Sequence, residues 1–212
     1  KANIPVTTTL MGLGAFPESD PLSLRMVGMH GLIAANKALN ECDLLVSIGA
    51  RFDDRVTGKA SEFAPHAKIA HIDIDPSAIG KTMRCDLPVV GDIHAVLSEL
   101  APQLREADHT QWVEQCLSWK TEEPYTFTPL SEEGIMPQYV LTVVDQLTKG
   151  NAIITTDVGQ NQMWSCQFLD HEKPRHFISS GGLGTMGFGL PAAIGAQLGC
   201  PGELVVCITG DG

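Results

Sequence analysis

Short apolar runs alternate with stretches of helical periodicity along most of this chain. Runs of strand length occupy residues 4–10, 43–49, 69–74, 152–156, 176–179 and 204–208, and Val89-Val90 marks one more. Strands that are apolar on both faces and separated by helices are typical of a parallel sheet covered on both sides. The pattern therefore predicts an α/β fold.

Helical periodicity fills most of the intervals between these runs. It covers residues 32–39, 92–104, 111–120, 137–149 and 190–198. Two of these segments carry start signals. Asp92 can accept the free amide hydrogens of a first helical turn, and Pro137 suits the first helical position. We expect a loop between the strands at 152–156 and 176–179.

A non-periodic stretch at residues 122–136 divides this pattern in two. It contains two prolines and a glycine, as linkers do. We predict a doubly wound, parallel-sheet α/β domain at 1–122, a linker at 123–136 and a second α/β domain at 137–212. Because the chain starts on a strand and ends on a strand and glycine turn, we expect both domains to be incomplete.

Composition excludes several classes of partner. The formal net charge of −11 argues against nucleic acid or an anionic membrane, since both need clustered lysine and arginine. No apolar run is long enough to span a membrane. The six cysteines form no C-x-x-C pair, which favours free thiols in a reduced, cytoplasmic protein.

A charged loop, Gly49-Ala50-Arg51-Phe52-Asp53-Asp54-Arg55-Val56-Thr57-Gly58, follows the second apolar run. Ligands of open α/β sheets bind at the carboxyl ends of strands, which makes this loop a candidate binding site. Gly49 lets a ligand approach the backbone, and Arg51 and Arg55 offer planar donors for phosphate or aromatic rings. A solvated loop with internal salt bridges explains these residues equally well.

The next strand ends in acidic residues. His71, Asp73 and Asp75 alternate and so are predicted on one face. An acid at a strand end commonly holds a ribose hydroxyl. Three alternating residues of one strand converge poorly on a metal ion, and capping of the following helix is an equally good explanation.

Two glycine-rich segments follow later in the chain. Gly182-Leu183-Gly184-Thr185-Met186-Gly187 fits G-x-G-x-x-G between a strand and a helix, but a convincing acid about 20 residues later is missing. A nicotinamide oxidoreductase is therefore only an alternative. Gly210-Asp211-Gly212 follows an apolar strand, where a carboxylate can hold Mg²⁺ against a diphosphate, although such turns are also common without a function.

Several segments together resemble the acetohydroxyacid synthase (acetolactate synthase) family of thiamine-diphosphate enzymes. They are residues 28–31, 49–58, 157–164 and 180–196, and the resemblance extends over essentially the whole chain. It implies an FAD-binding middle domain followed by the start of a thiamine-diphosphate-binding domain. The implied reaction is the condensation of pyruvate with a second 2-keto acid, with release of CO₂, in branched-chain amino acid biosynthesis.

The resemblance also implies positions for three cofactors. For FAD, structural in this family, they are Thr9, Leu10, Met11, Met29, Gly49, Ala50, Arg51, Asp53, Arg55, Val56, Asp73, Ile74, Asp92 and Ile93. For thiamine diphosphate they are Val158, Gly159 and Gln160. Two positions would be catalytic: the Gly184 carbonyl accepts from the aminopyrimidine, and Met186 supports the bent cofactor. Asp211 would be the first Mg²⁺ ligand.

The chain departs from the family at Asn161, where histidine is usual. An amide can donate to a phosphate but cannot titrate. The implied partners are 2-keto acids, further copies of the subunit in a homodimer or homotetramer, and a small regulatory subunit. Alternatives are pyruvate oxidase, another thiamine-diphosphate decarboxylase or carboligase, and a non-catalytic FAD-binding module. We expect the 212-residue chain alone to be inactive.

Overall fold

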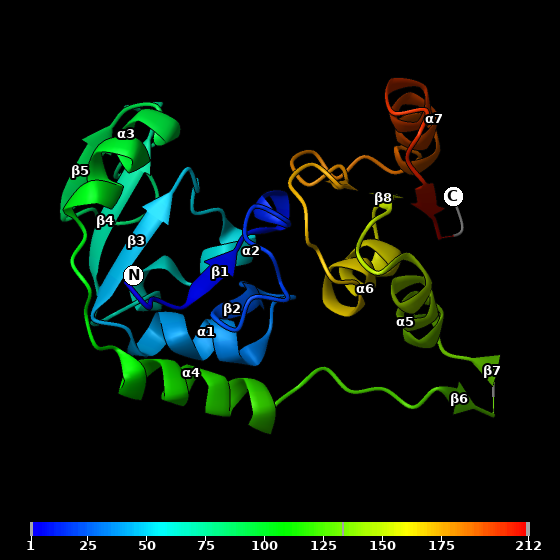
Figure 1. The fold of residues 1–212 in the computed structure, drawn as a ribbon, viewed down its shortest axis with the longest axis horizontal. Coiled ribbons are helices and arrows are strands. Elements are labelled where there is room, and N and C mark those ends of the chain that lie inside the picture. The colour runs from blue at the N-terminus through cyan, green and yellow to red at the C-terminus, as the bar shows by residue number, and fades with distance from the viewer. Residues whose placement is uncertain (1, 133, 211–212) are drawn as a thin grey trace. The chain divides into compact units, whose positions relative to one another are not determined.

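The computed structural model describes residues 2–132 and 134–210. The chain forms two compact units, each with its own parallel sheet (Figure 1). Unit 1 consists of Val27–Glu123 together with residues up to Pro5. Unit 2 consists of Val6–Met26 together with residues from Pro124 onward.

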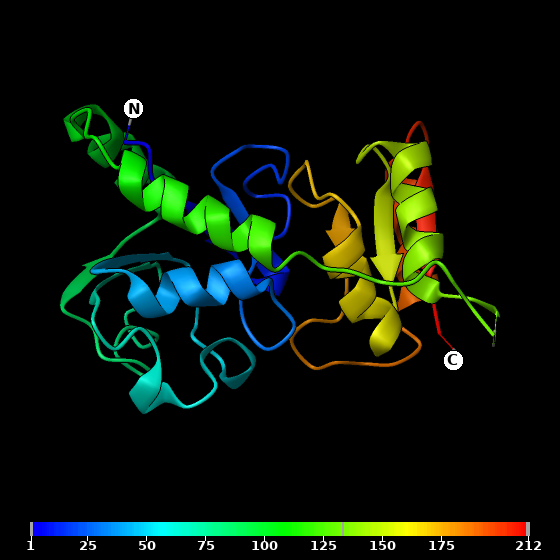
Figure 2. The ribbon, with the colours of Figure 1, turned by 90° about the horizontal axis from the view of Figure 1, so that it is seen from below.

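Unit 1 contains a three-stranded parallel sheet in the order β3-β4-β5. Its strands are β3 (Leu44–Ile48), β4 (Lys68–Asp73) and β5 (Leu87–Val90). Its helices are α1 (Ile33–Glu41), α2 (Asp54–Thr57), α3 (Ile93–Leu100) and α4 (Thr110–Glu122), with 3-10 turns η2 (Ala60–Glu62) and η3 (Ala101–Gln103). Helices α1 and α4 lie side by side (Figure 2).

The central strand β4 forms the core of unit 1. Residues 69–72 are all buried, and because consecutive side chains point to opposite faces, both faces of the sheet are covered at this strand, which β3 and β5 flank. The edge strand β3 is different, since Leu44, Val46 and Ile48 are between 43% and 56% exposed. Alternate side chains of a strand point to the same face, so the described residues leave this face of β3 open. The prediction of a sheet covered on both sides is wrong here.

Unit 2 contains a second parallel sheet, in the order β10-β8-β9. Its strands are β8 (Ile153–Thr156), β9 (Phe177–Ile178) and β10 (Val205–Ile208). Its helices are α5 (Pro137–Thr148), α6 (Gln160–Phe168) and α7 (Gly189–Gly199). All of β8 is buried, because it lies between the other strands and packs against α7. Leu141, Ile154 and Leu169 belong to the core of this unit.

Val6–Met26 packs in unit 2. It forms the parallel strands β1 (Val6–Thr8) and β2 (Ser23–Met26), joined through a 3-10 turn, η1 (Leu10–Gly12). Leu13 and Met26 are buried against Cys166 of α6. The sequence pattern placed this segment in the first domain, because periodicity reveals elements but not their packing partners. The predicted domain boundaries stay a prediction.

Two features lie where no element was expected. The segment between β8 and β9 contains α6, so the prediction of a loop there is wrong. The sequence of α6, QNQMWSCQF, mixes polar and apolar residues around the helix and shows no apolar stripe. The linker carries a small antiparallel hairpin, β6 (Leu130–Ser131) and β7 (Gly134–Ile135).

Two predicted helix starts are confirmed. Asp92 caps α3 by accepting from Ala95 N–H at 3.0 Å, and Pro137 is the first residue of α5. All six cysteines lie among the described residues and are free thiols. Within the same residues, no helix combines the length and the apolar character needed to cross a membrane.

Candidate functional site

Three loops leave the carboxyl edge of the unit 2 sheet. They follow β8, β9 and β10, which run parallel, so all three open at the same edge, where α/β sheets bind ligands. Residues 157–159 lead from β8 into α6, and residues 179–188 form a glycine-rich loop from β9 to α7. Thr209 and Gly210 follow β10. This edge is our candidate thiamine-diphosphate site.

Hydrogen bonds fasten the glycine-rich loop at its two ends. The buried carboxylate of Asp157 accepts from Phe188 N–H at 2.9 Å, and the Thr156 hydroxyl donates to Ser179 Oγ at 2.8 Å. Glycine is required at 189, because a Cβ there would lie 2.9 Å from Asp157 N. Between these fixed ends Leu183 is 95% exposed. The middle of the loop is therefore open to a ligand.

The predicted thiamine positions are gathered at this edge. Val158 and Gly159 form the turn into α6, which begins at Gln160. Gly159 has φ 140°, a left-handed value that favours glycine, and the described chain supplies no side-chain cap for α6. Gly184 has φ 67°, and its Cβ position lies 3.9 Å from Val158 Cγ1. Met186, on the same loop, is 64% exposed.

This arrangement fits a diphosphate. The first N–H groups of a helix have no partner within the helix, and here no described side chain takes their place. Such N–H groups bind phosphate. Left-handed glycines in both neighbouring loops let a ligand approach the backbone, because they present no side chain.

The proposed metal position is described only in part. Asp211, the predicted Mg²⁺ ligand, lies outside the described residues. Among the residues that are described, no group of three or more His, Cys, Asp or Glu side chains is arranged to hold a metal ion. The preceding Gly210 is described, and its Cβ position lies 3.6 Å from Asn161 Oδ1.

Several predicted FAD positions meet at the carboxyl edge of the unit 1 sheet. Gly49 follows β3, Asp73 ends β4, and Asp92 follows β5. Gly49 N–H donates to Ile72 C=O at 2.8 Å, and its Cβ position lies 2.9 Å from Ile93 Cδ1. Gly49 also has φ 66°, a left-handed value that favours glycine there, whereas the Ile93 side chain could shift to make room for a Cβ. The missing side chain leaves backbone accessible beside the acids, which suits a flavin nucleotide.

The charged loop after Gly49 contains internal salt bridges, as predicted by the alternative interpretation that it is a solvated loop. Arg51 pairs with Asp53 at 3.0 Å, and Arg55 pairs with Asp54 at 3.1 Å. Asp53 also caps α2 by accepting from Arg55 and Val56 N–H. Because the side chains of Arg51 and Arg55 are 66% and 69% exposed, both retain donors for a ligand.

Phe52 anchors this loop to the core. It is 6% exposed, and its ring packs edge-on against His71 at 5.0 Å and against Phe63 at 6.0 Å. His71 is itself buried in β4, with Nε2 3.8 Å from Asp73 Oδ2. Asp75 lies beyond β4, where it accepts from Ser77 N–H. The prediction of one shared strand face is therefore wrong for Asp75, because the strand ends at Asp73.

A groove of about 450 Å³ borders the far end of the loop. Met29, Arg55 and Val56, all predicted FAD positions, line it together with residues of α1. Met29 N–H donates to Arg55 C=O at 2.7 Å. A Cβ on Gly28 would lie 2.6 Å from that same oxygen, so glycine is required where the two segments meet.

The remaining predicted FAD positions, Thr9, Leu10 and Met11, belong to unit 2. A Cβ on Gly181 would lie 2.5 Å from Met11 Sδ and 3.0 Å from Leu10 Cδ2. These residues thus lie beside the start of the glycine-rich loop, whereas the other predicted FAD positions belong to unit 1.

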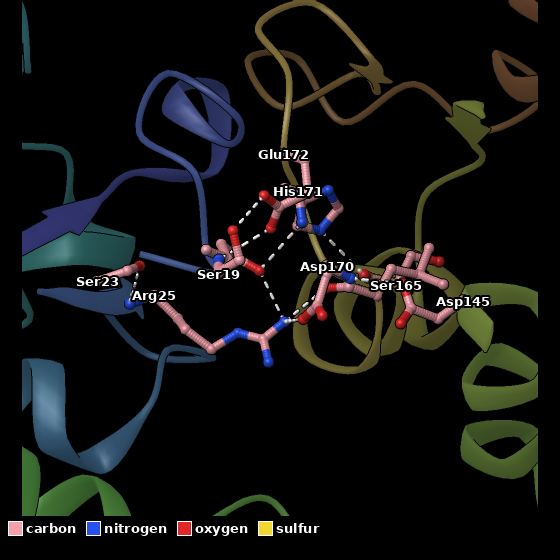
Figure 3. Close-up of polar contacts among 10 residues, drawn as sticks. Ser19, Ser23, Arg25, Asp145, Ser165, Asp170, His171 and Glu172 are labelled. Atoms are coloured by element: carbon pink, nitrogen blue, oxygen red, sulfur yellow. Dashed lines mark hydrogen bonds and ion pairs between the residues drawn. The ribbon is translucent and has the colours of Figure 1, made fainter. Parts of the chain in front are cut away.

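Sequence reasoning missed a partly buried charged cluster in unit 2 (Figure 3). Arg25 of β2 pairs with Glu18 at 2.7 Å and with Asp170 at 3.0 Å, and it donates to Leu169 C=O at 2.6 Å. Glu18 also accepts from His171 N–H at 3.3 Å. No periodic signal joins these residues, because they lie far apart in sequence on segments that meet only in the fold.

Burial controls the titration of this cluster. The Glu18 side chain is 1% exposed, and desolvation raises the pKa of its carboxyl to about 7, against the opposing effect of Arg25. Burial, together with the positive charge of Arg25, lowers the pKa of His171 to about 4. Burial thus favours the neutral form of both groups.

Comparison with known proteins covers both units. Residues 1–100 match the family described as thiamine pyrophosphate enzyme, central domain, and residues 157–212 match its C-terminal TPP binding domain. Acetolactate synthase 1, chloroplastic, of Oryza sativa subsp. japonica is 52% identical over 99% of this chain. The acetolactate synthase large subunit of Parasynechococcus marenigrum is 52% identical over 98% of it, and acetolactate synthase of Mycobacterium bovis 47% over 99%.

The chain spans about a third of the length of these relatives, at 33%, 34% and 35% respectively. The first match contains the three-stranded sheet of unit 1, and the second begins directly after β8 and contains β9, β10 and the glycine-rich loop. This similarity confirms the resemblance found in the sequence motifs. The chain belongs to the thiamine pyrophosphate enzymes.

Proposed function

We propose that this chain is part of an acetolactate synthase, and that it supplies the diphosphate-binding edge of the thiamine site together with a flavin-binding region. The reaction of the whole protein is the condensation of pyruvate with a second 2-keto acid, with release of CO₂. One observation carries the proposal: the uncapped start of α6 at Gly159 lies beside Gly184 of an open glycine-rich loop. The relatives named acetolactate synthase support the choice of reaction.

Thiamine diphosphate, when bound, supplies the carbanion chemistry that joins two keto acids. The residues of this chain bind and orient. N–H groups of Gln160 and its neighbours hold the diphosphate, with Val158 and Gly159 forming the turn. The Gly184 carbonyl accepts a hydrogen bond from the aminopyrimidine, and Met186 packs against the cofactor. Asp211 holds Mg²⁺ against the diphosphate.

FAD is the proposed second cofactor, with a structural role. Its site is the carboxyl edge of the unit 1 sheet, where Gly49, Asp73 and Asp92 follow one another across the strands. Arg51 and Arg55 provide exposed guanidinium donors beside that edge. The other predicted positions in unit 1, Ala50, Asp53, Val56, Ile74, Ile93 and Met29, neighbour these residues in the chain or line the adjoining groove.

The whole protein is proposed to act in branched-chain amino acid biosynthesis as a cytoplasmic homodimer or homotetramer with a small regulatory subunit. The division of the chain into a domain at 1–122, a linker at 123–136 and a second domain at 137–212 is part of the same proposal. Plant relatives carry the word chloroplastic in their names, and a direct measurement of location in the cell tests this part of the proposal.

A matched pair of glycine substitutions tests the site in the intact protein that contains this chain. Gly159→Ala adds a Cβ at φ 140° and 3.1 Å from Asn161 Oδ1, whereas Gly202→Ala adds one where no atom lies within 4 Å. Left-handed strain of roughly 1 to 3 kcal/mol predicts at least several-fold weaker thiamine-diphosphate binding for Gly159→Ala. Gly202→Ala should bind like the wild type.

Product analysis tests the reaction. The wild-type protein with pyruvate, thiamine diphosphate, Mg²⁺ and FAD should form acetolactate, detected as acetoin after acid treatment. Formation of hydrogen peroxide instead would indicate a pyruvate oxidase, and acetaldehyde alone would indicate a decarboxylase. Binding of FAD without turnover of pyruvate would indicate a non-catalytic module. Each of these three outcomes would refute the synthase proposal.

A further inference from the structure

The segment Val6–Met26, which we call the strap, belongs to one region by sequence and to another by packing. By sequence it lies within the match to the central domain, residues 1–100. In the fold it is part of unit 2, together with the described residues that match the C-terminal TPP binding domain. A piece of the central-domain match therefore lies in the unit that contains the candidate thiamine edge.

The strap is fastened to the segment that follows α6. Besides the apolar contacts with Cys166, it makes two polar ones to a single carboxylate (Figure 3): Ser19 donates to Glu172 through its N–H at 2.9 Å and through its hydroxyl at 2.6 Å. Backbone also meets backbone, since a Cβ on Gly14 would overlap the carbonyl of Lys173. These contacts fix the strap within unit 2.

The strap places η1 against the start of the glycine-rich loop. A Cβ on Gly181 would lie 2.5 Å from Met11 Sδ and 3.0 Å from Leu10 Cδ2, so both side chains lie directly on this glycine. Leu10 is partly buried against the apolar cluster around Cys166, which limits its freedom to move away. Gly181 does not have a left-handed φ, so the neighbouring side chains, and not its backbone conformation, favour glycine there.

Hydrogen bonds within the loop carry this constraint to a proposed thiamine position. Gly181 N–H donates to Ser179 C=O at 3.0 Å. Ser180, between them, accepts from Gly184 N–H at its carbonyl, at 3.1 Å, and from Thr185 N–H at its hydroxyl, at 2.9 Å. The Thr185 N–H and the Gly184 carbonyl belong to one planar peptide group. The start of the loop therefore sets the direction of the Gly184 carbonyl.

We propose that the strap supports the glycine-rich loop: η1 holds Gly181 in place, and the bonds of Ser180 then direct the Gly184 carbonyl. Leu10 and Met11 act through the loop, so they are positioning residues for thiamine diphosphate. This inference rests on the proposed thiamine-diphosphate function. It goes beyond that function because it makes thiamine affinity depend on a segment of the central-domain match, so that any change that moves the strap regulates the thiamine site.

A double-mutant cycle between Gly181 and Met11 tests the contact, read as the thiamine-diphosphate affinity of the intact protein from quenching of tryptophan fluorescence. Saturating Mg²⁺ and FAD are present, so that any effect of Met11 on flavin binding does not enter. Gly181→Ala should weaken binding by roughly fivefold, the lower end for an added methyl group, because the exposed Met11 can partly yield. In the Met11→Ala background the same change should cost less than about twofold.

Gly202→Ala is the matched control, because no atom lies within 4 Å of its Cβ position. It should leave thiamine-diphosphate affinity unchanged with or without Met11. Two results would overturn the inference. One is an unchanged affinity in Gly181→Ala. The other is an equal loss in both backgrounds, since that marks a clash with the cofactor and not with η1.

A second variant keeps the inference open to refutation if Gly181→Ala does not fold. Leu10→Ala withdraws a partly buried side chain from the same glycine and should weaken thiamine-diphosphate binding several-fold at saturating FAD. An unchanged affinity in Leu10→Ala would contradict the proposal. A wild-type protein that binds no thiamine diphosphate refutes the proposed function instead.

Discussion

Glu18 offers a sharp test of how burial shapes the charged cluster of unit 2. Its carboxyl has a pKa of about 7 in the folded protein, against 4.5 in the reference state. Each pKa unit corresponds to about 1.4 kcal/mol, so ionising Glu18 costs the folded state about 3 kcal/mol at most. Because the pKa of Glu18 is raised in the folded protein, its protonated carboxyl contributes stability below pH 4.5, and this contribution is lost as the pH rises to about 7.

Glu18→Gln replaces the carboxyl with a neutral group of the same shape. At pH 8 the variant should be more stable than the wild type by up to about 3 kcal/mol, and near pH 4.5 the two should be similar. The opposing argument is that removing one partner of a buried ion pair commonly destabilises by about 3 to 5 kcal/mol. Arg25 keeps its contact with Asp170, which lessens that loss.

Thermal unfolding of the intact protein between pH 4.5 and 8 provides the assay, with the melting temperature of the variant compared with that of the wild type at each pH. The comparison matters because His171 has the opposite trend: its lowered pKa means that stability falls as the pH drops from 6.5 to about 4. Glu172→Gln is the control, since Glu172 accepts from Ser19 at an exposed position. A Glu18→Gln variant that is less stable than the wild type at pH 8 would refute the reasoning.

Three further predictions concern the cofactors and the chain itself. Arg51→Ala should weaken FAD binding by about tenfold, which is less than a buried charged hydrogen bond would contribute, because Arg51 is 66% exposed. Lys68→Ala, at the exposed first residue of β4 and so at the opposite edge of the sheet, should leave FAD binding unchanged; flavin absorbance after gel filtration measures both. Asp211→Asn should raise the Mg²⁺ requirement for acetolactate formation sharply, and an unchanged requirement would exclude Asp211 as a ligand. The purified 212-residue chain should form no acetolactate above a no-protein control, because it spans about a third of its relatives, and sustained turnover would contradict this.

The periodic parts of the fold were predictable from sequence. Both parallel sheets follow from short apolar runs separated by helical segments, and local signals at Asp92 and Pro137 located two helix starts. Helix α6 was missed because its buried residues, Ser165 and Cys166, are small and its remaining surface is mixed. Hydrophobic periodicity cannot detect a helix without an apolar stripe.

The candidate sites were predictable only where a local pattern carries them. Gly49, Gly159 and Gly184 adopt left-handed backbone conformations beside strand ends, as the glycine-rich motifs indicated. The Arg25 cluster and the contact of Met11 with Gly181 were not predictable, because each joins segments distant in sequence. The role of Phe52 was likewise hidden, since an aromatic residue in a charged loop gives no sign that its ring reaches the core.

The packing of Val6–Met26 has a consequence for proteolysis. The chain passes between the two units at three places, near residues 5, 26 and 124, so the units are interleaved in sequence. A protease that cuts only within 124–136 would leave two fragments still held together, because Met26 and Leu13 remain buried against Cys166 and Arg25 remains paired with Asp170. Cutting every connection between the units needs two further cuts, close to residues 5 and 26.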